Sequence, residues 1–101
     1  MSKYITADKV TSPMKRWSLV RVLESGDQED SSGQRVAIAL GTWEGDPVLG
    51  MRWNGSEDHP IGSPQSRGLP TWFIIPRRLE DSVLATLSQD EQKIARSILN
   101  K

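Results

Sequence analysis

Residues 35–75 limit the possible fold of this chain more than any other part of the sequence. Apolar residues alternate with other residues over 35–42 and again over 48–53, and Glu44-Gly45-Asp46 lies between the two runs. Alternation with a period of two is typical of a half-buried β-strand, and glycine and aspartate favour tight turns. The stretch therefore predicts two antiparallel strands joined by a tight turn, followed by a loop and another strand.

Two more strands are predicted on either side of this hairpin. Residues 17–23 are rich in β-branched and aromatic residues, and residues 71–75 form a similar run that ends at Pro76. Glycine, proline and polar residues fill the segments between the strands, 24–34 and 54–70, which predicts loops. The second loop is long for a compact domain, and loops of that length are often functional or mobile.

The last part of the chain changes to a helical period. Apolar residues recur at helical spacing at Leu79, Val83, Leu84 and Leu87, and then at Ile94, Ala95, Ile98 and Leu99. Ser88 stands three residues before Glu91, as in a capping box. Residues 17–101 are therefore predicted to form a single α+β domain: a four-stranded antiparallel curved sheet followed by a C-terminal helix or helix pair packing on one face.

The first residues of the chain are polar and predict a flexible basic arm over residues 1–16. Up to residue 22 the only acidic residue is Asp8, whereas the basic residues are Lys3, Lys9, Lys15, Arg16 and Arg21. A basic arm can help to hold a strand of nucleic acid, and it can equally be a solubilising tail.

Composition limits the class of protein further. The chain has 101 residues, which is the length of one domain, and its 13 basic residues balance its 13 acidic residues. With no net charge, binding to a polyanion would require local segregation of charge. There is no cysteine, which suits a reducing compartment, and no apolar run long enough to span a membrane. We therefore expect a cytoplasmic protein without a membrane segment.

Alternation assigns two faces to the predicted sheet. The apolar face should be the core face that the C-terminal helix covers, and it carries Val20, Val22, Val36, Ile38, Leu40, Leu49, Met51 and Trp53. The other face mixes arginines, tryptophans and small residues: Trp17, Leu19, Arg21, Arg35, Ala37, Ala39, Gly41, Trp43, Gly50, Arg52 and Asn54. Small residues let a ligand approach the backbone, arginines neutralise phosphates, and aromatic rings stack on unpaired bases.

This second face has two interpretations. In the first, it is a binding surface on which Arg21, Arg35 and Arg52 lie side by side, exposed to solvent. In the second, it is an ordinary solvated sheet face with scattered arginines, and Trp17 and Trp43 pack on the N-terminal arm.

Three short motifs carry a family resemblance: Trp43-Glu44-Gly45, Met51-Arg52 with Trp53, and Arg67-Gly68 before Leu69. They resemble the turn, the following strand and the Lys-Gly pair before the last strand in bacterial members of the positive-cofactor-four-like family of single-stranded-DNA-binding proteins. The resemblance covers residues 17–87. It implies a homodimer whose curved sheets bind single strands, with Arg52 and Arg67 on phosphates and Trp43 stacked on a base.

Two functions are compatible with these features. The first is a small non-enzymatic module that binds single-stranded DNA or RNA through Trp17, Arg21, Arg35, Trp43, Arg52 and Arg67. The second is a protein-interaction or accessory protein without a nucleic-acid role, since tryptophan and arginine are also enriched at protein interfaces. Salt dependence separates the two, because nucleic-acid binding weakens steeply with salt.

The sequence predicts no catalytic residue, no cofactor and no metal site. His59 lies beside Glu57-Asp58, but no nucleophile accompanies it at an informative spacing. Neighbouring residues of this kind rarely converge on one metal ion without a shaped loop.

The apolar residues of the C-terminal segment exceed what a four-stranded sheet should cover, and small domains are short of core. We therefore expect a homodimer in which this segment contributes to the contact. The alternative is that residues 88–101 fold back and complete a monomeric core.

Overall fold

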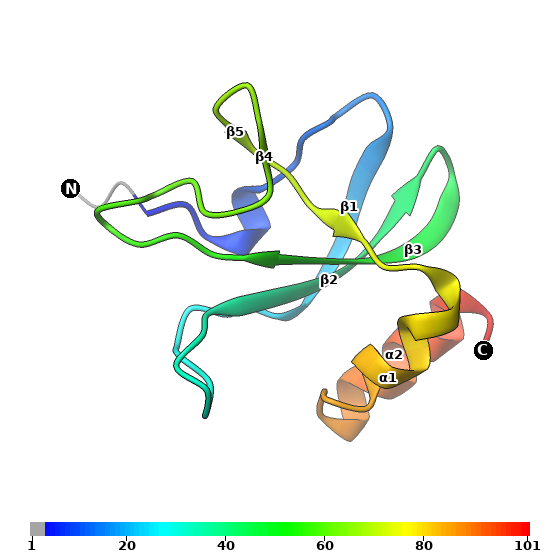
Figure 1. Cartoon of the computed structure of the whole chain (residues 1–101). Helices are drawn as coiled ribbons and strands as arrows, with labels where there is room; N and C mark the ends of the chain where they lie inside the picture. Colours follow the sequence, from blue (N-terminus) through cyan, green and yellow to red (C-terminus); the bar gives the residue numbers. More distant parts are fainter. Residues whose placement is uncertain (1–3) are drawn as a thin grey trace.

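A four-stranded antiparallel sheet in the order β1-β2-β3-β6 forms the centre of the computed structural model, which describes residues 4–101 (Figure 1). Its strands are β1 (Trp17–Glu24), β2 (Val36–Trp43), β3 (Asp46–Trp53) and β6 (Phe73–Ile74). The short helices η2 (Arg77–Leu79) and α1 (Glu80–Leu84) and the longer helix α2 (Gln89–Leu99) follow the sheet. The predicted α+β fold, with an antiparallel sheet and a C-terminal helix pair, is confirmed.

The central hairpin lies where the alternation predicts it. β2 and β3 pair without a break, from Val36 opposite Trp53 to Trp43 opposite Asp46. The turn residues Glu44 and Gly45 both have positive φ, 52° and 93°. This is the geometry of two-residue turns that match the twist of paired strands, and glycine adopts it without strain.

The segments outside the sheet contain more structure than their sequences suggest. In the loop before β6, β4 (Gln65–Ser66) and β5 (Leu69–Pro70) form a two-stranded ribbon. The segment before β1 contains a short helix, η1 (Ala7–Lys9). Residues 1–3, which begin the predicted arm and include Lys3, lie outside the described residues.

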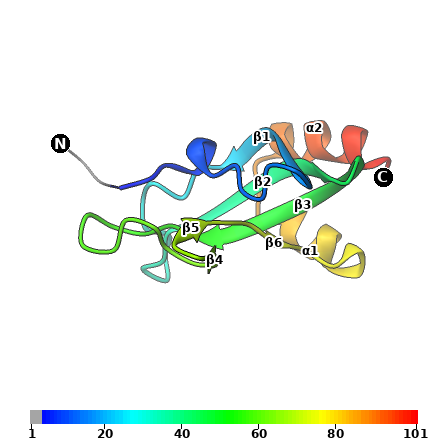
Figure 2. The same ribbon diagram turned by 90° about the horizontal axis from the view of Figure 1, so that it is seen from above.

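Each face of the sheet packs on a different part of the chain. One face, which we call the helix face, packs on the helices through Leu23, Ile38, Leu40, Leu49, Ile75, Leu84, Leu87, Ala95 and Leu99. On the other, the N-terminal face, the cluster consists of Ala7, Val10, Trp17, Ala37, Ala39 and Trp72. In Figure 1 the helices lie below the sheet and the N-terminal segment above it. Figure 2 shows that the helices gather toward the end of the sheet that carries the β2–β3 turn.

The N-terminal segment packs on the sheet, whereas its polar residues predict a loose arm. Ala7 and Val10 are buried, and the indole Nε1 of Trp72 donates a 2.7 Å hydrogen bond to the carbonyl oxygen of Val10. The segment is as apolar as the rest of the chain, and Tyr4, Ala7 and Val10 recur every three residues, but the polar residues between them and Pro13 after them favour the interpretation as an arm. The second sheet face is therefore covered by residues of the same chain.

β1 departs from strict alternation because it contains bulges. Its register against β2 shifts between Leu19 and Arg21, and it shifts again further along the strand. After the first shift, Arg21 lies opposite Leu40, whose side chain is buried on the helix face. Arg21 donates hydrogen bonds of 2.8 and 2.7 Å to the two carboxylate oxygens of Glu91 in α2. The bulge therefore moves Arg21 to the face opposite the predicted one.

Three residues assigned to the helix-covered core lie elsewhere. Val20 is exposed beside the first bulge, and Val22 packs on the N-terminal face opposite Ala39. Trp53 lies beyond the reach of the helices and is exposed. The remaining assignments are confirmed, because the helix-face cluster contains or contacts Val36, Ile38, Leu40, Leu49 and Met51.

The helix α2 completes the core within its own chain. Ser88 caps it by accepting a 3.3 Å hydrogen bond from the backbone amide of Glu91, as the capping pattern predicts. Ala95 and Leu99 of α2 are buried in the helix-face cluster. Of the two arrangements considered for residues 88–101, the structure shows the one in which they fold back onto the sheet.

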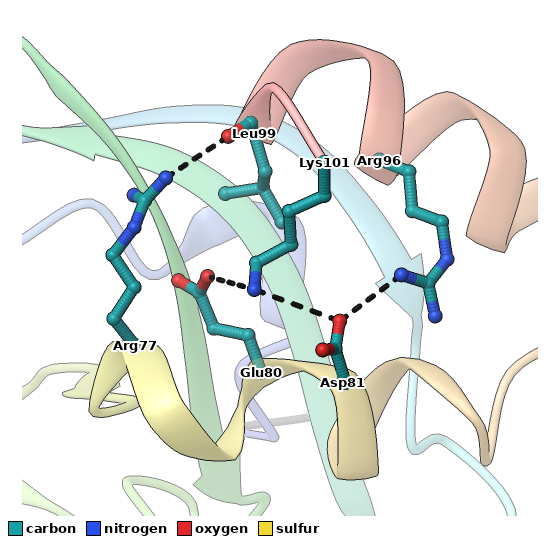
Figure 3. A network of polar contacts seen from close by, with 6 residues as sticks. All are labelled: Arg77, Glu80, Asp81, Arg96, Leu99 and Lys101. Carbon is teal, nitrogen blue, oxygen red and sulfur yellow. Dashed lines mark hydrogen bonds and ion pairs between the residues drawn. The ribbon is translucent and has the colours of Figure 1, made fainter.

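A polar network joins α1 to the C-terminal end of α2, and Figure 3 shows its members: Arg77, Glu80, Asp81, Arg96, Leu99 and Lys101. Arg77 stands at the start of its own helix, where a cation is unfavourable. Its guanidinium group, however, donates a 3.1 Å hydrogen bond to the carbonyl oxygen of Leu99. The charge is thus placed at the C-terminal end of α2, where a cation is favourable.

We expect this network to make stability depend on the ionisation of Asp81. The hydrogen bond from Arg96, and then the charge of Lys101, hold the pKa of Asp81 below its ordinary value. Ionised Asp81 therefore stabilises the fold above its unfolded pKa of about 3.9, and this contribution is lost as the pH falls through the lower folded pKa. In urea denaturation, Asp81→Asn should be less stable than the wild type at about pH 7, and the difference should shrink at about pH 3. A stability difference of the same size at both pH values would contradict the role of ionised Asp81. The matched control is Asp58→Asn, at a position in an exposed loop.

Candidate functional site

The six residues predicted to bind nucleic acid do not form one surface. Trp17 and Arg52 are buried, Arg35 and Trp43 are half-buried, and Arg21 and Arg67 are exposed. Arg21 lies on the helix face, Arg52 lies opposite Ala37 on the N-terminal face, and Arg67 lies at the turn of the β4–β5 ribbon. The prediction of one exposed row containing Arg21, Arg35 and Arg52 is therefore wrong.

Two tryptophan side chains cover the small residues of the N-terminal face. A Cβ atom at Gly41 would lie 2.3 Å from the ring of Trp17, and one at Gly50 would lie 3.2 Å from the Cβ atom of Trp72. The centroids of the two indole rings are 5.9 Å apart. The small residues do permit a close approach, but the groups that approach are side chains of the same chain. The space predicted for a ligand is a second hydrophobic core.

Arg52 holds the loop between β3 and β6 from inside the protein. Only 2% of its surface is exposed, and its guanidinium group donates hydrogen bonds to the backbone carbonyl oxygens of Ile61, Pro64 and Thr71. Burial lowers the pKa of Arg52 from its ordinary value. By the family resemblance, the N–H groups of Arg52 would contact phosphates. In this structure they donate to carbonyl groups of the chain itself.

Arg35 ties the N-terminal segment to the loops. Its guanidinium group lies over the ring of Tyr4, 5.6 Å from the centroid, and donates a 3.4 Å hydrogen bond to the carbonyl oxygen of Gly55. Tyr4 donates a 2.9 Å hydrogen bond to Asp27, and burial together with this bond raises the pKa of Tyr4 to about 12. These contacts give Arg35 a structural role at the edge of the second core.

An exposed apolar area on the helix face is the surface that sequence reasoning missed. The side chains of β3 on this face run from Leu49, which is 0% exposed, through half-buried Met51 to Trp53, which is 53% exposed. Phe73 of β6, which lies opposite Met51, is 55% exposed. The helices gather toward the other end of the sheet (Figure 2), and Trp53 and Phe73 are both more than half exposed. We call Met51, Trp53 and Phe73 the open sheet end. Leu79 of η2, which is 46% exposed, lines a hollow beside Met51.

Two hollows border the open sheet end, and both are lined by Met51. The smaller, with a volume of about 310 Å³, is lined by Trp53, Phe73 and Pro64 among others. The larger, of about 600 Å³, lies between the loop after β1 and helix α1. Aromatic and methionine side chains around such hollows are typical of protein interfaces.

A third hollow, of about 770 Å³, lies among the loops at the opposite end from the helices and is bordered by Arg35, Asn54, Asp58 and His59. His59 belongs to a local turn, since Ser56 donates a 2.9 Å backbone hydrogen bond to its carbonyl oxygen. Within residues 4–101, no cluster of three metal-ligating side chains occurs, and no helix is long and apolar enough to cross a membrane. This hollow gives no basis for assigning a reaction.

Comparisons with known proteins provide no relative whose function could be considered for this chain. No family model, no curated protein and no solved structure matches it. The resemblance to the positive-cofactor-four-like family stays a prediction, and function has to be inferred from the geometry of the chain's own residues.

Proposed function

We propose that this protein is a non-enzymatic protein-interaction module that binds a partner protein at the open sheet end. The observation that carries the proposal is the change in exposure along one face of β3, from the fully buried Leu49 to the exposed Trp53. Covering exposed apolar surface is favourable in water, so this area gains free energy from a partner. Tryptophan, phenylalanine and methionine are also enriched in protein interfaces, and tryptophan dominates their binding energy.

Single-stranded nucleic acid is the competing ligand, and the observations support it less. Binding of this kind requires arginines and aromatic rings on one accessible surface. Trp17 and Arg52 are buried, and Arg21 is paired with Glu91 on the helix face. Trp53 and Phe73 are exposed aromatic residues. The arginine of the predicted set that lies beside them is Arg52, and it is buried.

Trp53→Ala should weaken partner binding by about 30-fold in Kd, which is about 2 kcal/mol, and leave the free energy of unfolding within about 1 kcal/mol of the wild type. A partner segment can be obtained by panning a displayed library of helical and extended peptides against the protein. Its affinity is then measured by fluorescence anisotropy. The matched control is Leu69→Ala on the β4–β5 ribbon, which removes a side chain that is equally exposed but lies outside the open sheet end.

Other outcomes separate the alternatives. A library that yields no binder, or binders that tolerate Trp53→Ala, would contradict the proposed function. Binding of single-stranded DNA of about 20 nucleotides that weakens steeply with salt would favour the nucleic-acid hypothesis. Light scattering that gives twice the 11.3 kDa of one chain would identify a second copy as the partner, as the predicted homodimer requires.

A further inference from the structure

We propose that the segment bound by this protein is an amphipathic α-helix with a basic polar face, and that it lies in the hollow of about 600 Å³ beside the open sheet end. This inference rests on the proposed function and specifies the chemistry of the partner. We call this hollow, between the loop after β1 and helix α1, the acidic groove.

The floor of the acidic groove is aliphatic. Val36, Ile38 and Met51 line it from β2 and β3, and Val83 and Leu87 line it from α1 and the residues after it. Val36, Met51 and Val83 are only half-buried, so each still offers apolar surface to a ligand. An occupant of the groove must therefore bring apolar side chains.

The charged residues of the acidic groove are all of one sign. Glu24, Glu29 and Asp30 line it, and within the described part of the chain its remaining lining residues are apolar or neutral. Hydrogen bonds from Ser32 and Gln34 lower the pKa of Asp30, which therefore carries a full negative charge at neutral pH. Lysine or arginine in a partner would be attracted to this rim, whereas aspartate or glutamate would be repelled.

The floor of the groove offers no strand edge to which a peptide backbone could bind, and the outer strand β1 lines the groove only through its last residue, Glu24. β2 lies between β1 and β3, and β3 lies between β2 and β6, so that the floor presents side chains. An extended peptide would leave backbone N–H and C=O groups without partners there, whereas a helix satisfies these groups internally. A helix also repeats apolar side chains on one face, which matches an aliphatic floor with a charged rim.

The test uses two helical peptides that share one leucine and isoleucine stripe and differ in the polar face, which carries lysine and arginine in one and glutamate in the other. At low salt, fluorescence anisotropy should show that the protein binds the basic peptide at least about tenfold more tightly, and added salt should reduce the preference. Neutralising two rim residues, Glu24→Gln with Glu29→Gln, should lower the preference by about fivefold. Asp30 is kept, because its hydrogen bonds shape the loop.

The matched control is Glu44→Gln with Asp46→Asn, which removes two exposed carboxylates at the β2–β3 turn and should leave the preference unchanged. Equal binding of the two peptides, or tighter binding of the acidic one, would overturn the basic partner and leave the interaction surface in place. If neither peptide binds, but library peptides bind and depend on Trp53, the partner lies outside the groove. That result would overturn this inference alone. A library without any binder would overturn the proposed function as well.

Discussion

Arg52→Ala should lower the free energy of unfolding by about 3 to 5 kcal/mol. The guanidinium group donates to the backbone carbonyl oxygens of Ile61, Pro64 and Thr71. Its loss removes a buried donor from all three, and within the described residues only Pro64 keeps a backbone partner, the amide of Thr71. The loop that it holds leads directly to Trp72, which belongs to the N-terminal-face cluster, so the effect should extend into that core. Urea denaturation followed by tryptophan fluorescence measures the change.

Two further variants separate the hydrogen bonds of Arg52 from its charge. Arg52→Lys keeps the charge but places it on one nitrogen. A single ammonium group cannot reproduce the several donor directions of a planar guanidinium group, so most of the loss of stability should remain. Arg67→Ala, at the exposed turn of the β4–β5 ribbon, should change stability by less than about 0.5 kcal/mol. If Arg52→Ala were as stable as the wild type, its structural role would be refuted, and Arg52 would again be a candidate for ligand binding.

Trp17→Ala should also lower the free energy of unfolding by about 3 to 5 kcal/mol and the Tm by more than about 10 °C. The ring fills the space above Gly41 and lies 5.9 Å from the ring of Trp72. Its neighbours on the sheet include Ala37 and Ala39, which have little side chain with which to fill the resulting cavity. Thermal unfolding followed by circular dichroism measures the loss.

Trp53→Ala is the matched control for Trp17→Ala, because it makes the same substitution at an exposed tryptophan. It should leave the Tm almost unchanged and weaken partner binding, whereas Trp17→Ala should do the reverse under conditions in which it is folded. Similar losses of stability in the two variants would contradict the distinction between the two positions. The sequence pattern predicts the opposite roles, with Trp17 on a ligand-binding face and Trp53 in the core.

Interactions between sequence neighbours made much of the fold predictable. The β2–β3 hairpin depends on alternation and on the turn at Glu44 and Gly45, and both are visible in a single stretch of sequence. The cap of α2 depends on Ser88 and Glu91, three residues apart. Strands and helices therefore lie close to their predicted places, and the fold class follows from them.

Contacts between distant residues made the candidate site unpredictable. A bulge in β1 reverses the direction of Arg21, and the hydrogen bond from Trp72 to Val10 joins residues 62 positions apart. An arginine on a strand has the same sequence signature whether it binds a phosphate or, like Arg52, backbone carbonyl groups. One signal did point to the second core: a face built from alanine and glycine needs large partners, and a chain with four tryptophans can supply them.

The strand β2 contributes to both hydrophobic cores through alternate residues. Ala37 and Ala39 belong to the N-terminal-face cluster, whereas Ile38 and Leu40 belong to the helix-face cluster. A single backbone cannot leave one core and keep its place in the other, so the two cores should be lost together in one cooperative transition. A ligand bound on the helix face would then also protect the N-terminal segment from opening, although the sheet separates the two.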